Sequence, residues 1–542
     1  MKMSLLVYLG KIVGSVDGGG NETPYDEEEY VPPQDGYNLN LTVDVNIQSI
    51  VEKNLEKAVT ENEAEFGMCV VMQPDTGKIL AMATAPDYNP NSPFTINDEA
   101  LLNNWDSYSS SEKSKYLNEM WKNYCVSSVY EPGSTFKVVT ASAALEEGLA
   151  DTDTKRYSCV GYMKILGWTV KCWRSPRSHG TENLRESIIN SCNPALMQIG
   201  LSIGAEKYCE YLDAFGLYAT TGVDLPGEAS PIAYTKTNMD ELDLATTSFG
   251  QNISVSVLQM ATVYCTIANG GNLVKPYIVD SVTTTDGSVV SQTETIVKRQ
   301  VLSKETTTQM MSVLYDTVNT GTSKAAQATG YKIAGKTGTA EEGRGANKKY
   351  MASFAGVAPY DDPQMVIIVS IYNPTSSAGH MGGVVAAPVG GTIIEETLAY
   401  MGVDPYYSEE ETSNEIIVPE LTGMTYSKAA ATLKDIGLSI ESDVALDDED
   451  IVLDQVPKSG SSLLPNGIVR VYNNKETTKG TTTVPNVRNK TVKNATYLLK
   501  KAGLNIKVVG SGNAIIQYPS ADEVITKGSI VTVKFVDTTD LH

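Results

Sequence analysis

A serine and a lysine three residues apart, Ser134 and Lys137, are the clearest chemical signal in the sequence. They lie in the segment EPGSTFK, whose proline and glycine interrupt the chain just before an apolar helix is predicted to begin. Because residues three apart share one face of a helix, the amine can reach the hydroxyl. Burial among apolar residues lowers the pKa of a lysine amine, so a neutral Lys137 could act as a base toward Ser134. The pair indicates a serine nucleophile with a lysine partner, and the structural alternative is a helix-capping serine followed by a solvated lysine.

Two further segments carry the residue types that an acyl-transfer site requires, Ser191-Cys192-Asn193 and Lys336-Thr337-Gly338-Thr339. The lysine of the second segment supplies a positive charge for a carboxylate, and its threonines supply hydroxyl donors. Its glycine has no side chain, so a substrate backbone can lie against the predicted strand there. Similar triplets at 110–113, 458–460 and 511–513 lie in turn-like sequence and are interpreted as structural. The order and surroundings of the motifs at Ser134, Ser191 and Lys336 indicate one site built from three distant segments.

The composition argues against several other kinds of function. The 542 residues carry 42 Lys and Arg against 65 Asp and Glu, a formal net charge of -23, whereas a nucleic-acid-binding protein needs a basic face. The three histidines leave little room for a Ser-His-Asp mechanism or a histidine-rich metal site. The seven cysteines form no CxxC pair, so a structural zinc site is not expected, and buried free thiols are predicted instead.

The segments that must position these residues predict an α+β fold. Strand-like sequence at 68–83, 331–340, 352–358 and 365–371 is expected to form part of a central antiparallel sheet with helices on both faces. The helix that follows Ser134 is almost wholly apolar, so it is expected to lie buried beside that sheet.

The C-terminal part of the chain contains an internal repeat. The segments that begin at Val418 and Val484 share Val-Pro and then alanine, leucine and glycine at an offset of 66 residues. Farther along, QVP at 455–457 matches QYP at 517–519 at an offset of 62, so the second copy has a shorter loop. Each copy predicts a leading segment, an amphipathic helix that ends at glycine, and short strands. Two copies are too few for a solenoid, so they indicate tandem small domains.

With these motifs in place, residues from about 39 to 400 resemble the transpeptidase domain of class B penicillin-binding proteins. The flanking sequence agrees with that family, as in LTVD at 41–44, GYKIAG at 330–335 and SFAG at 353–356. The two repeats resemble PASTA domains, small modules associated with peptidoglycan and with proteins that bind beta-lactams. Within the larger domain, KCWR at 171–174 and NSCNP at 190–194 resemble the sporulation-specific members, which make spore cortex peptidoglycan.

The resemblance implies a serine D,D-transpeptidase with the fold of penicillin-binding proteins and serine beta-lactamases. Ser134 would attack the penultimate D-Ala of a D-Ala-D-Ala stem peptide, Lys137 would take its proton, and Ser191 would relay a proton to the leaving D-Ala. Asn193 would hold the substrate amide. The terminal carboxylate region would be bound by Lys336, Thr337, Gly338 and Thr339. The backbone N–H groups of the first serine and of the last threonine would form the oxyanion hole.

The same resemblance implies the partners and the location. Stem peptides and lipid-linked or nascent glycan are the expected substrates, beta-lactams the covalent inhibitors, and a glycosyltransferase the expected partner protein, with no metal, cofactor or nucleic acid. The full-length parent is expected at the extracytoplasmic face of a bacterial membrane, held by a single-pass anchor. The chain as given is expected to be soluble and to lack that anchor.

The resemblance also predicts the domain limits. A remnant of the N-terminal pedestal and linker is expected at 1–38 and the transpeptidase domain at 39–402. The PASTA domains are expected at 415–475 and 483–539, with linkers at 403–414 and 476–482.

Two alternatives remain open at this stage. One is a carboxypeptidase or a beta-lactamase of the same fold. A beta-lactamase needs a positioned deacylation base, and the setting of the candidate acids Glu228, Asp240, Glu241 and Asp243 assigns none of them that role. The other alternative is a non-catalytic protein that binds the cell wall or senses beta-lactams, which the intact set of motifs argues against.

Cys192, at the centre of the second motif, has two interpretations. The simpler one is a small buried side chain that fills space. The second pairs it with Cys172 in a disulfide that would pull on Ser191 and Asn193, so that activity would depend on a thiol reductant.

Overall fold

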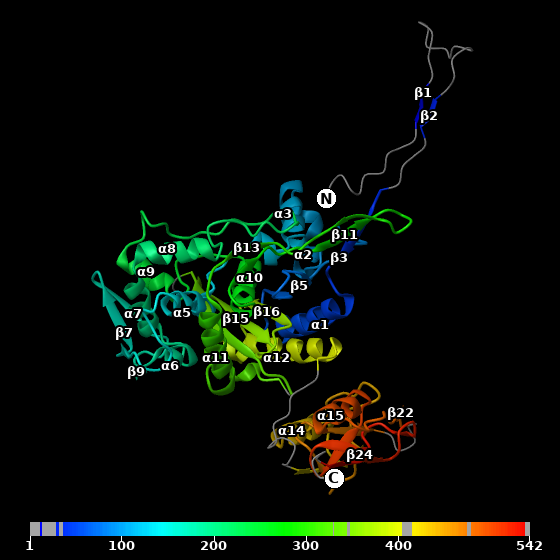
Figure 1. Ribbon diagram of the computed structural model, residues 1–542. Coiled ribbons are helices and arrows are strands. Elements are labelled where there is room, and N and C mark those ends of the chain that lie inside the picture. The colour runs from blue at the N-terminus through cyan, green and yellow to red at the C-terminus, as the bar shows by residue number, and fades with distance from the viewer. Residues whose placement is uncertain are drawn as a thin grey trace, which may run out of the picture. The chain divides into compact units, whose positions relative to one another are not determined.

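The computed structural model describes residues 11–13, 29–31, 36–328, 330–343, 347–403, 415–473 and 479–536 (Figure 1). The chain divides into two compact units, one that ends at Thr397 and leaves out 329–331, and one that comprises those three residues and Leu398 onward. Among the described residues, no helix combines the length and the apolar character that a bilayer span requires. Most of the expected pedestal remnant at 1–38 and almost all of the expected linker at 403–414 lie outside the described residues. The expected linker at 476–482 lies partly outside them.

The centre of the first unit is a five-stranded antiparallel sheet. Its strand order is β14 (Ala334–Glu342), β15 (Lys349–Ala358), β16 (Met365–Tyr372), β4 (Phe66–Met72) and β5 (Ile79–Ala85). Every neighbouring pair is antiparallel, and Lys336 of β14 lies opposite Ala355 of β15. The strand-like segments predicted from the sequence are therefore confirmed as one sheet, and β14 forms one of its edges.

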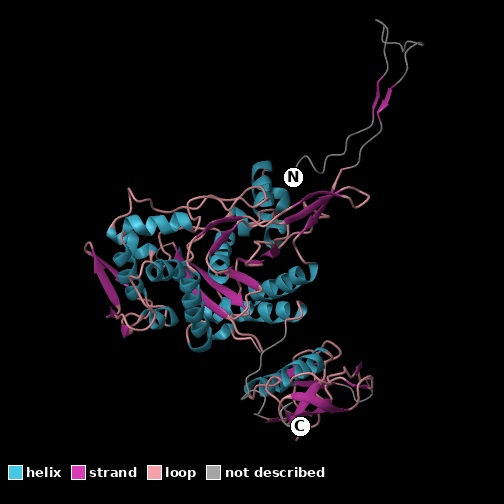
Figure 2. Ribbon diagram, viewed as in Figure 1, coloured by secondary structure: helices cyan, strands magenta, loops and turns pink. Residues whose placement is uncertain are grey.

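Helices cover both faces of this sheet (Figure 2). One face of β4 shares a buried core with α10 (Val257–Ala268) through Met68, Val70 and Met72. The other face packs on α1 (Val45–Glu61), where a β-carbon on Gly67 would lie 2.9 Å from Leu55. α12 (Gly382–Tyr400) runs beside α1 (Figure 1), and one ion pair of 3.1 Å joins the two helices. Because successive side chains of a strand point to opposite faces, the two helical layers receive alternate residues.

A group of helices beside the sheet carries the first two motifs. The 3-10 turn η2 (Gly133–Phe136) leads directly into α5 (Lys137–Glu146), in which residues 137–144 are all buried. α6 (Leu184–Ile189) and α7 (Asn193–Ile203) have the second motif between them, and α11 (Lys304–Thr320) contacts α5, α6 and β14. The predicted buried helix is confirmed, but it begins at Lys137 rather than at Ser134, because Ser134 lies in the preceding 3-10 turn.

The other elements of the first unit are short or peripheral. The helices and turns are α2 (Glu99–Asn103), η1 (Trp105–Ser107), α3 (Ser110–Met120), α4 (Tyr124–Ser127), α8 (Ala205–Ala214), α9 (Glu241–Thr247) and η3 (Lys324–Ala326). The strands pair as β1 (Lys11–Val13) with β2 (Glu29–Val31), as β10 (Asn272–Val274) with β13 (Val297–Gln300), and as a sheet of β12 (Val289–Gln292), β11 (Val279–Thr283) and β3 (Asn38–Leu41).

An insert at 157–182, between α5 and α6, was not predicted from the sequence. It consists of two strand pairs, β6 (Tyr157–Cys159) with β9 (Gly180–Glu182) and β7 (Tyr162–Ile165) with β8 (Trp168–Lys171). These strands have three or four residues each, too few to show a clear alternation of polar and apolar residues. We call this segment the 157–182 insert.

The second unit contains two small α+β modules. In the first, α14 (Tyr426–Asp435) accompanies the sheet β18 (Ser439–Glu441), β21 (Ile468–Tyr472) and β19 (Asp454–Val456), and β17 (Ile416–Ile417) pairs with β20 (Ser462–Leu463). In the second, α15 (Val492–Lys501) accompanies β23 (Asn505–Val509), β26 (Ile530–Val536) and β24 (Asn513–Tyr518), and β22 (Thr481–Thr483) pairs with β25 (Val524–Thr526). The predicted tandem repeat is therefore confirmed as a structural repeat.

One hydrogen-bonded glutamine recurs in both modules. Gln455 accepts a hydrogen bond from the N–H of Leu421 at 2.8 Å and donates to the carbonyl of Pro419 at 3.1 Å. Gln517 makes the same two bonds with the equivalent residues of its own module, at 2.8 and 3.0 Å. The side chain thus joins each leading segment to its sheet, which explains why glutamine occupies both positions.

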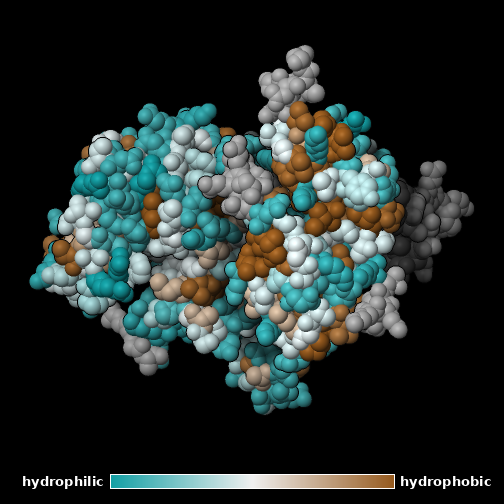
Figure 3. All heavy atoms as spheres, turned by 90° about the horizontal axis from the view of Figure 1, so that it is seen from below, coloured by the Kyte–Doolittle hydropathy of each residue, from teal (hydrophilic) through white to brown (hydrophobic). Residues whose placement is uncertain are grey.

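The face of the molecule in Figure 3 is largely hydrophilic, and its hydrophobic residues form separate patches. Isolated apolar side chains on a surface are normal for folded proteins. The larger share of the apolar side chains of the first unit lies instead in the buried core around α5, α7 and α10.

Candidate active site

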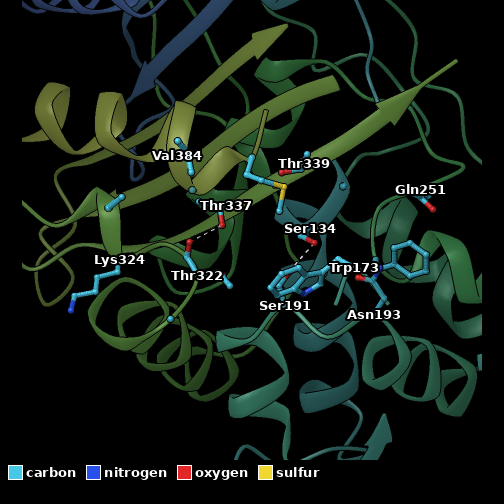
Figure 4. Close-up of a pocket in the computed structure, with 17 residues that line it drawn as sticks. Ser134, Trp173, Ser191, Asn193, Gln251, Thr322, Lys324, Thr337, Thr339 and Val384 are labelled. Atoms are coloured by element: carbon cyan, nitrogen blue, oxygen red, sulfur yellow. Dashed lines mark hydrogen bonds between the residues drawn. The ribbon is translucent and has the colours of Figure 1, made fainter. Parts of the chain in front are cut away.

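Ser134 lies on the turn η2 and lines a cavity of about 410 Å³ (Figure 4). Backbone contacts hold this turn: Gly133 donates through its N–H to the carbonyl of Gly250 at 3.0 Å, and the Tyr264 hydroxyl donates to the carbonyl of Thr135 at 3.0 Å. A β-carbon on Gly250, whose φ is 85°, would lie 2.0 Å from the carbonyl oxygen of Gly133. The turn is therefore fixed by close backbone packing that does not involve the Ser134 hydroxyl.

Hydrogen bonds connect Ser134 to Lys137 through Ser191. The Oγ atom of Ser191 donates to Ser134 Oγ at 2.9 Å, and Lys137 Nζ lies 3.1 Å from Ser191 Oγ. The same amine donates to the carbonyl of Ser191 at 2.7 Å and to Asn193 Oδ1 at 2.8 Å. A neutral lysine amine has two hydrogens and one lone pair. Because both hydrogens are donated to these two acceptors, the lone pair of a neutral Lys137 would point at Ser191 Oγ.

A second buried amine, that of Lys336, reaches the same hydroxyl. Lys336 Nζ lies 3.1 Å from Ser191 Oγ and donates to the carbonyl of Thr337 at 2.9 Å. We call Ser134, Lys137, Ser191, Asn193 and Lys336 the amine cluster. The sequence analysis predicted every member, and the structure brings all of them together.

The amine cluster is electrostatically unbalanced. Lys137 and Lys336 are both fully buried, and neither pairs with a carboxylate among the residues that the structure describes. Burial lowers the pKa of Lys137 to about 8. Burial, together with the nearby charge of Lys137, lowers the pKa of Lys336 well below its ordinary value. An anion that entered the cavity would offset the cost of burying these amines.

The second motif adopts a strained backbone turn. Ser191 has a φ of 56°, in the left-handed region that non-glycine residues rarely occupy. The chain turns within two residues, because Asn190 caps the end of α6 and α7 begins at Asn193. The N–H of Cys192 donates to the carbonyl of Ser187 at 2.8 Å, which helps to hold the turn. Strain of this kind persists where surrounding contacts enforce it, and it is common at functional sites.

The third motif forms part of the cavity wall on β14. The N–H of Thr337 donates to Ser323 Oγ at 3.0 Å, and Thr339 Oγ1 accepts from the N–H of Gly382 at 3.0 Å. The structure gives a packing reason for the glycine at 338, and the predicted contact with a substrate backbone stays a prediction. A β-carbon there would lie 2.5 Å from Ser353 Oγ and 2.9 Å from the carbonyl of Pro132, so the glycine is required by the protein's own packing.

Several lining residues were not identified from the sequence. They are Trp173, Gln251, Thr322, Lys324, Met381 and Val384. In Figure 4, Trp173 lies next to Ser191, Thr322 lies next to Thr337, and the Lys324 side chain points away from Ser134. No motif of the proposed chemistry marks these positions, which come from the loop after β8, the segment after α9, the turn after α11 and the start of α12.

The other candidate triplets and acids lie outside this cavity. Ser110–Lys113, interpreted as turn sequence, in fact begins α3, which Ser109 and Glu112 cap. Glu228 accepts hydrogen bonds from Thr221, and Asp240 and Asp243 form the capping box that starts α9. The described lining of the cavity includes no carboxylate.

Next to the second motif, Cys192 lies close to three residues of the 157–182 insert. Sγ atoms of Cys159, Cys172 and Cys192 and a ring nitrogen of His179 all lie within 4.8 Å of one another. We call these four residues the thiol cluster. The lack of a CxxC pair therefore did not exclude a metal-type cluster, and sequence reasoning missed Cys159 and His179. Cys172 and Cys192 are both thiols in the structure, so their pairing in a disulfide stays a prediction.

Known proteins are similar in sequence to this chain over most of its length. The family described as penicillin binding protein transpeptidase domain matches residues 67–395, and the PASTA domain family matches 416–475 and 482–537. Stage V sporulation protein D of Bacillus subtilis is 33% identical over 87% of this chain and 70% of its own length. The peptidoglycan D,D-transpeptidase FtsI of Escherichia coli K12 is 30% identical over 72% of this chain and 61% of its own length, so the chain spans about three fifths of that relative.

Solved structures are similar in fold. The apo structure of the TP domain from Burkholderia pseudomallei penicillin-binding protein 3 is 27% identical with a TM-score of 0.55, covering 68% of this chain and 98% of that one. A peptidoglycan synthetase from Bifidobacterium adolescentis is 26% identical with a TM-score of 0.62, covering 74% of this chain and 68% of that one.

Proposed function

Because this chain belongs to the family of penicillin-binding-protein transpeptidases and carries two PASTA domains, we propose that it cross-links peptidoglycan stem peptides through an acyl-enzyme on Ser134. Its catalytic domain is that of a peptidoglycan D,D-transpeptidase. The observation that carries the assignment of residues is the hydrogen-bonded series from Ser134 through Ser191 to the buried Lys137.

Acylation begins with two proton transfers along this series. The Ser191 hydroxyl, which donates to Ser134 Oγ in the structure, first turns its hydrogen toward the neutral Lys137. Ser134 Oγ then attacks the carbonyl carbon of the penultimate D-Ala and gives its proton to Ser191 Oγ, while the Ser191 proton moves to Lys137 Nζ. When the tetrahedral intermediate collapses, the proton returns through Ser191 to the amine of the leaving D-Ala. Lys137 is neutral again, and the acyl group stays on Ser134 as an ester. A general base with a pKa near the working pH suits this role.

The substrate is held along β14 and the second motif. The N–H of Thr337 points off the sheet edge toward Ser323, and strand alternation gives the N–H of Thr339 the same direction. That N–H and the N–H of Ser134 are therefore the proposed oxyanion hole. Lys336 and the hydroxyls of Thr337 and Thr339 bind the region of the terminal carboxylate, beside the backbone at Gly338. Asn193, already bonded to Lys137, holds the substrate amide.

Release of the acyl group requires an amine from a second stem peptide, which restores the Ser134 hydroxyl and forms the cross-link. The beta-lactamase alternative needs a carboxylate that activates water. Glu228, Asp240 and Asp243 are engaged in local hydrogen bonds, and the described cavity wall has no acid. This favours a long-lived acyl-enzyme with beta-lactams over rapid turnover.

The wider biological role follows from the relatives. We propose that the protein acts at the extracytoplasmic face of the membrane, on nascent glycan from a partner glycosyltransferase, and that its PASTA domains bind peptidoglycan. The similarity to Stage V sporulation protein D supports a role in spore cortex synthesis. Expression of the gene together with cortex assembly in sporulating cells would support that role, and expression confined to vegetative growth would contradict it.

Intact mass after incubation with a penicillin tests the proposed chemistry. A stable increase of one penicillin mass is expected, and the Ser134→Ala variant should show none. An adduct that persists in the Ser134→Ala variant, or one that disappears within seconds, would contradict the proposal. Incubation of the acyl-enzyme from a D-Ala-D-Ala peptide with an added amine acceptor then separates a transpeptidase, which forms the amide, from a carboxypeptidase, which forms only the acid.

A further inference from the structure

The thiol cluster joins residues that are far apart in the sequence. Cys159 ends β6, Cys172 follows β8, His179 precedes β9 and Cys192 lies between α6 and α7. All three cysteines are at most 2% exposed. We propose that Cys159, Cys172, His179 and Cys192 together bind one zinc ion. This inference concerns a site that the proposed acyl-transfer reaction does not use.

The distances within the cluster suit a tetrahedral zinc site. Nδ1 of His179 lies 3.7 Å from Cys159 Sγ and 3.5 Å from Cys172 Sγ. With Zn–S bonds of about 2.3 Å and a Zn–N bond of about 2.0 Å, tetrahedral angles place sulfur and nitrogen about 3.5 Å apart. The same bond lengths place two sulfurs about 3.8 Å apart, and all four donor atoms lie within 4.8 Å of one another. Small movements would therefore bring the four donors into coordination.

The orientation of His179 supports Nδ1 as the donor atom. Nε2 of this ring is buried and has no hydrogen-bond partner among the described residues. The ring is therefore positioned by the sulfur atoms at its Nδ1 edge rather than by a bond at its other nitrogen. When Nδ1 binds a metal, the proton resides on Nε2.

The number of sulfur atoms favours a metal over a disulfide. A Cys172–Cys192 disulfide would consume two thiols and leave Cys159 and His179 beside it without a shared role. Three thiolates and one imidazole form one of the usual complete ligand sets of a structural zinc ion. Each cysteine that enters coordination loses its thiol proton to solvent, so zinc uptake releases protons and involves no redox change.

Zinc here would position the second catalytic motif. Cys192 stands between Ser191 and Asn193, and it occupies the N-cap of α7 without making a side-chain capping bond. A metal bond would anchor its sulfur to the 157–182 insert and so fix the strained turn at Ser191 from behind. Zinc would thus hold the motif in place without contacting the substrate.

The first experiment measures the metal content of the whole 542-residue protein, purified under reducing conditions without added metal. Elemental mass spectrometry is expected to find about one zinc per chain, and Cys159→Ser and Cys172→Ser should each fall below about a tenth of that value. Cys209→Ser and Cys265→Ser are matched controls, since both replace buried thiols outside the cluster and should keep the zinc.

Cobalt substitution keeps the test decisive if a cluster variant fails to fold. Wild-type protein stripped of zinc and given Co²⁺ should show the intense visible bands and the sulfur charge-transfer band of a tetrahedral thiolate site, and added zinc should abolish them. Reduced, folded wild-type protein that holds no zinc and gives no such spectrum would overturn the proposal. So would a Cys172–Cys192 disulfide found by peptide mapping in protein prepared anaerobically with excess zinc.

A functional measurement completes the test. Penicillin acylation of the zinc-free wild type should fall by about tenfold and should recover when zinc is restored. If zinc removal leaves the acylation rate unchanged, the ion does not position the second motif. Failure of the acyl-enzyme proposal would be seen separately, because it would leave the metal content unaffected.

Discussion

The amine cluster and the thiol cluster meet in the second motif, which gives Ser191 and Asn193 to the first and Cys192 to the second, but they are held in different ways. Hydrogen bonds from α5, β14 and the second motif itself connect every member of the amine cluster. In the thiol cluster the four side chains contact one another through sulfur atoms and one ring nitrogen, and backbone groups of Arg174 and Asn193 also lie beside Cys172. One cluster is therefore organised by protein groups alone, whereas the other is suited to organisation by a metal ion.

The largest expected effect comes from removing the base of the amine cluster. Lys137→Met should lower the rate of penicillin acylation by about 10²–10⁴-fold, because Lys137 is the proposed acceptor of the proton from Ser191. Stopped-flow fluorescence with a labelled penicillin measures the rate. Lys115→Met, on the exposed face of α3, is the matched control and should react at the wild-type rate. A Lys137→Met variant as fast as wild type would mean that the base lies elsewhere.

The backbone frame of the amine cluster should tolerate no added volume at Gly338. Gly338→Ala is expected to lower the free energy of unfolding by about 1–3 kcal/mol through overpacking. Thermal denaturation measures the loss. Adding Ser353→Ala should recover part of it, because Ser353 Oγ is the atom nearest to the new β-carbon. If the double variant is no more stable than the single one, the contact with Ser353 is not the cause.

The pH dependence of acylation should reflect Lys137. Burial lowers the pKa of this amine to about 8, so the neutral, reactive form increases as the pH rises through that value. Below it the acylation rate should fall by about tenfold per pH unit, and above it the rate should level off. Measurements of the rate on wild type from neutral to alkaline pH would show this profile. A flat profile would indicate that Lys137 remains neutral throughout.

The smallest effect on the acylation rate is expected from a substitution in the thiol cluster. Cys192→Ser should lower acylation by about tenfold or less, because the hydrogen bonds of the amine cluster do not involve its sulfur. An oxidant such as diamide should slow acylation of the wild-type protein, and it should not slow the variant. Equal sensitivity of both proteins to the oxidant would show that oxidation acts at another residue.

The amine cluster could be predicted from the sequence because each of its members belongs to a short motif. Ser134 and Lys137 are one helical turn apart, and Ser191 and Lys336 stand in recognisable triplets. The sheet could be predicted because its strands are long, apolar and bounded by turn residues. Local pattern was sufficient in these cases, since the physical constraint acts between near neighbours.

The thiol cluster and the lining residues depend on tertiary structure alone. Cys172 comes 13 residues after Cys159, His179 follows after seven more and Cys192 after a further 13, so no short motif connects them. The 157–182 insert that brings them together has strands too short to be recognised by periodicity. The tight packing of Gly338 against Ser353 likewise links two strands whose register the sequence does not state.

If beta-lactams acylate Ser134 as proposed, the left-handed backbone at Ser191 restricts how resistance to them could evolve in this protein. Glycine, asparagine and aspartate tolerate a φ of 56°, but β-branched and bulky residues do not, so few substitutions are accessible there. Selection would act instead on the cavity wall, where Met381 is 42% exposed and Val384 is 52% exposed. Changes at those two side chains would alter the space around a bound drug while the turn at Ser191 stays intact. Escape mutations should therefore accumulate at the start of α12 rather than in the second motif.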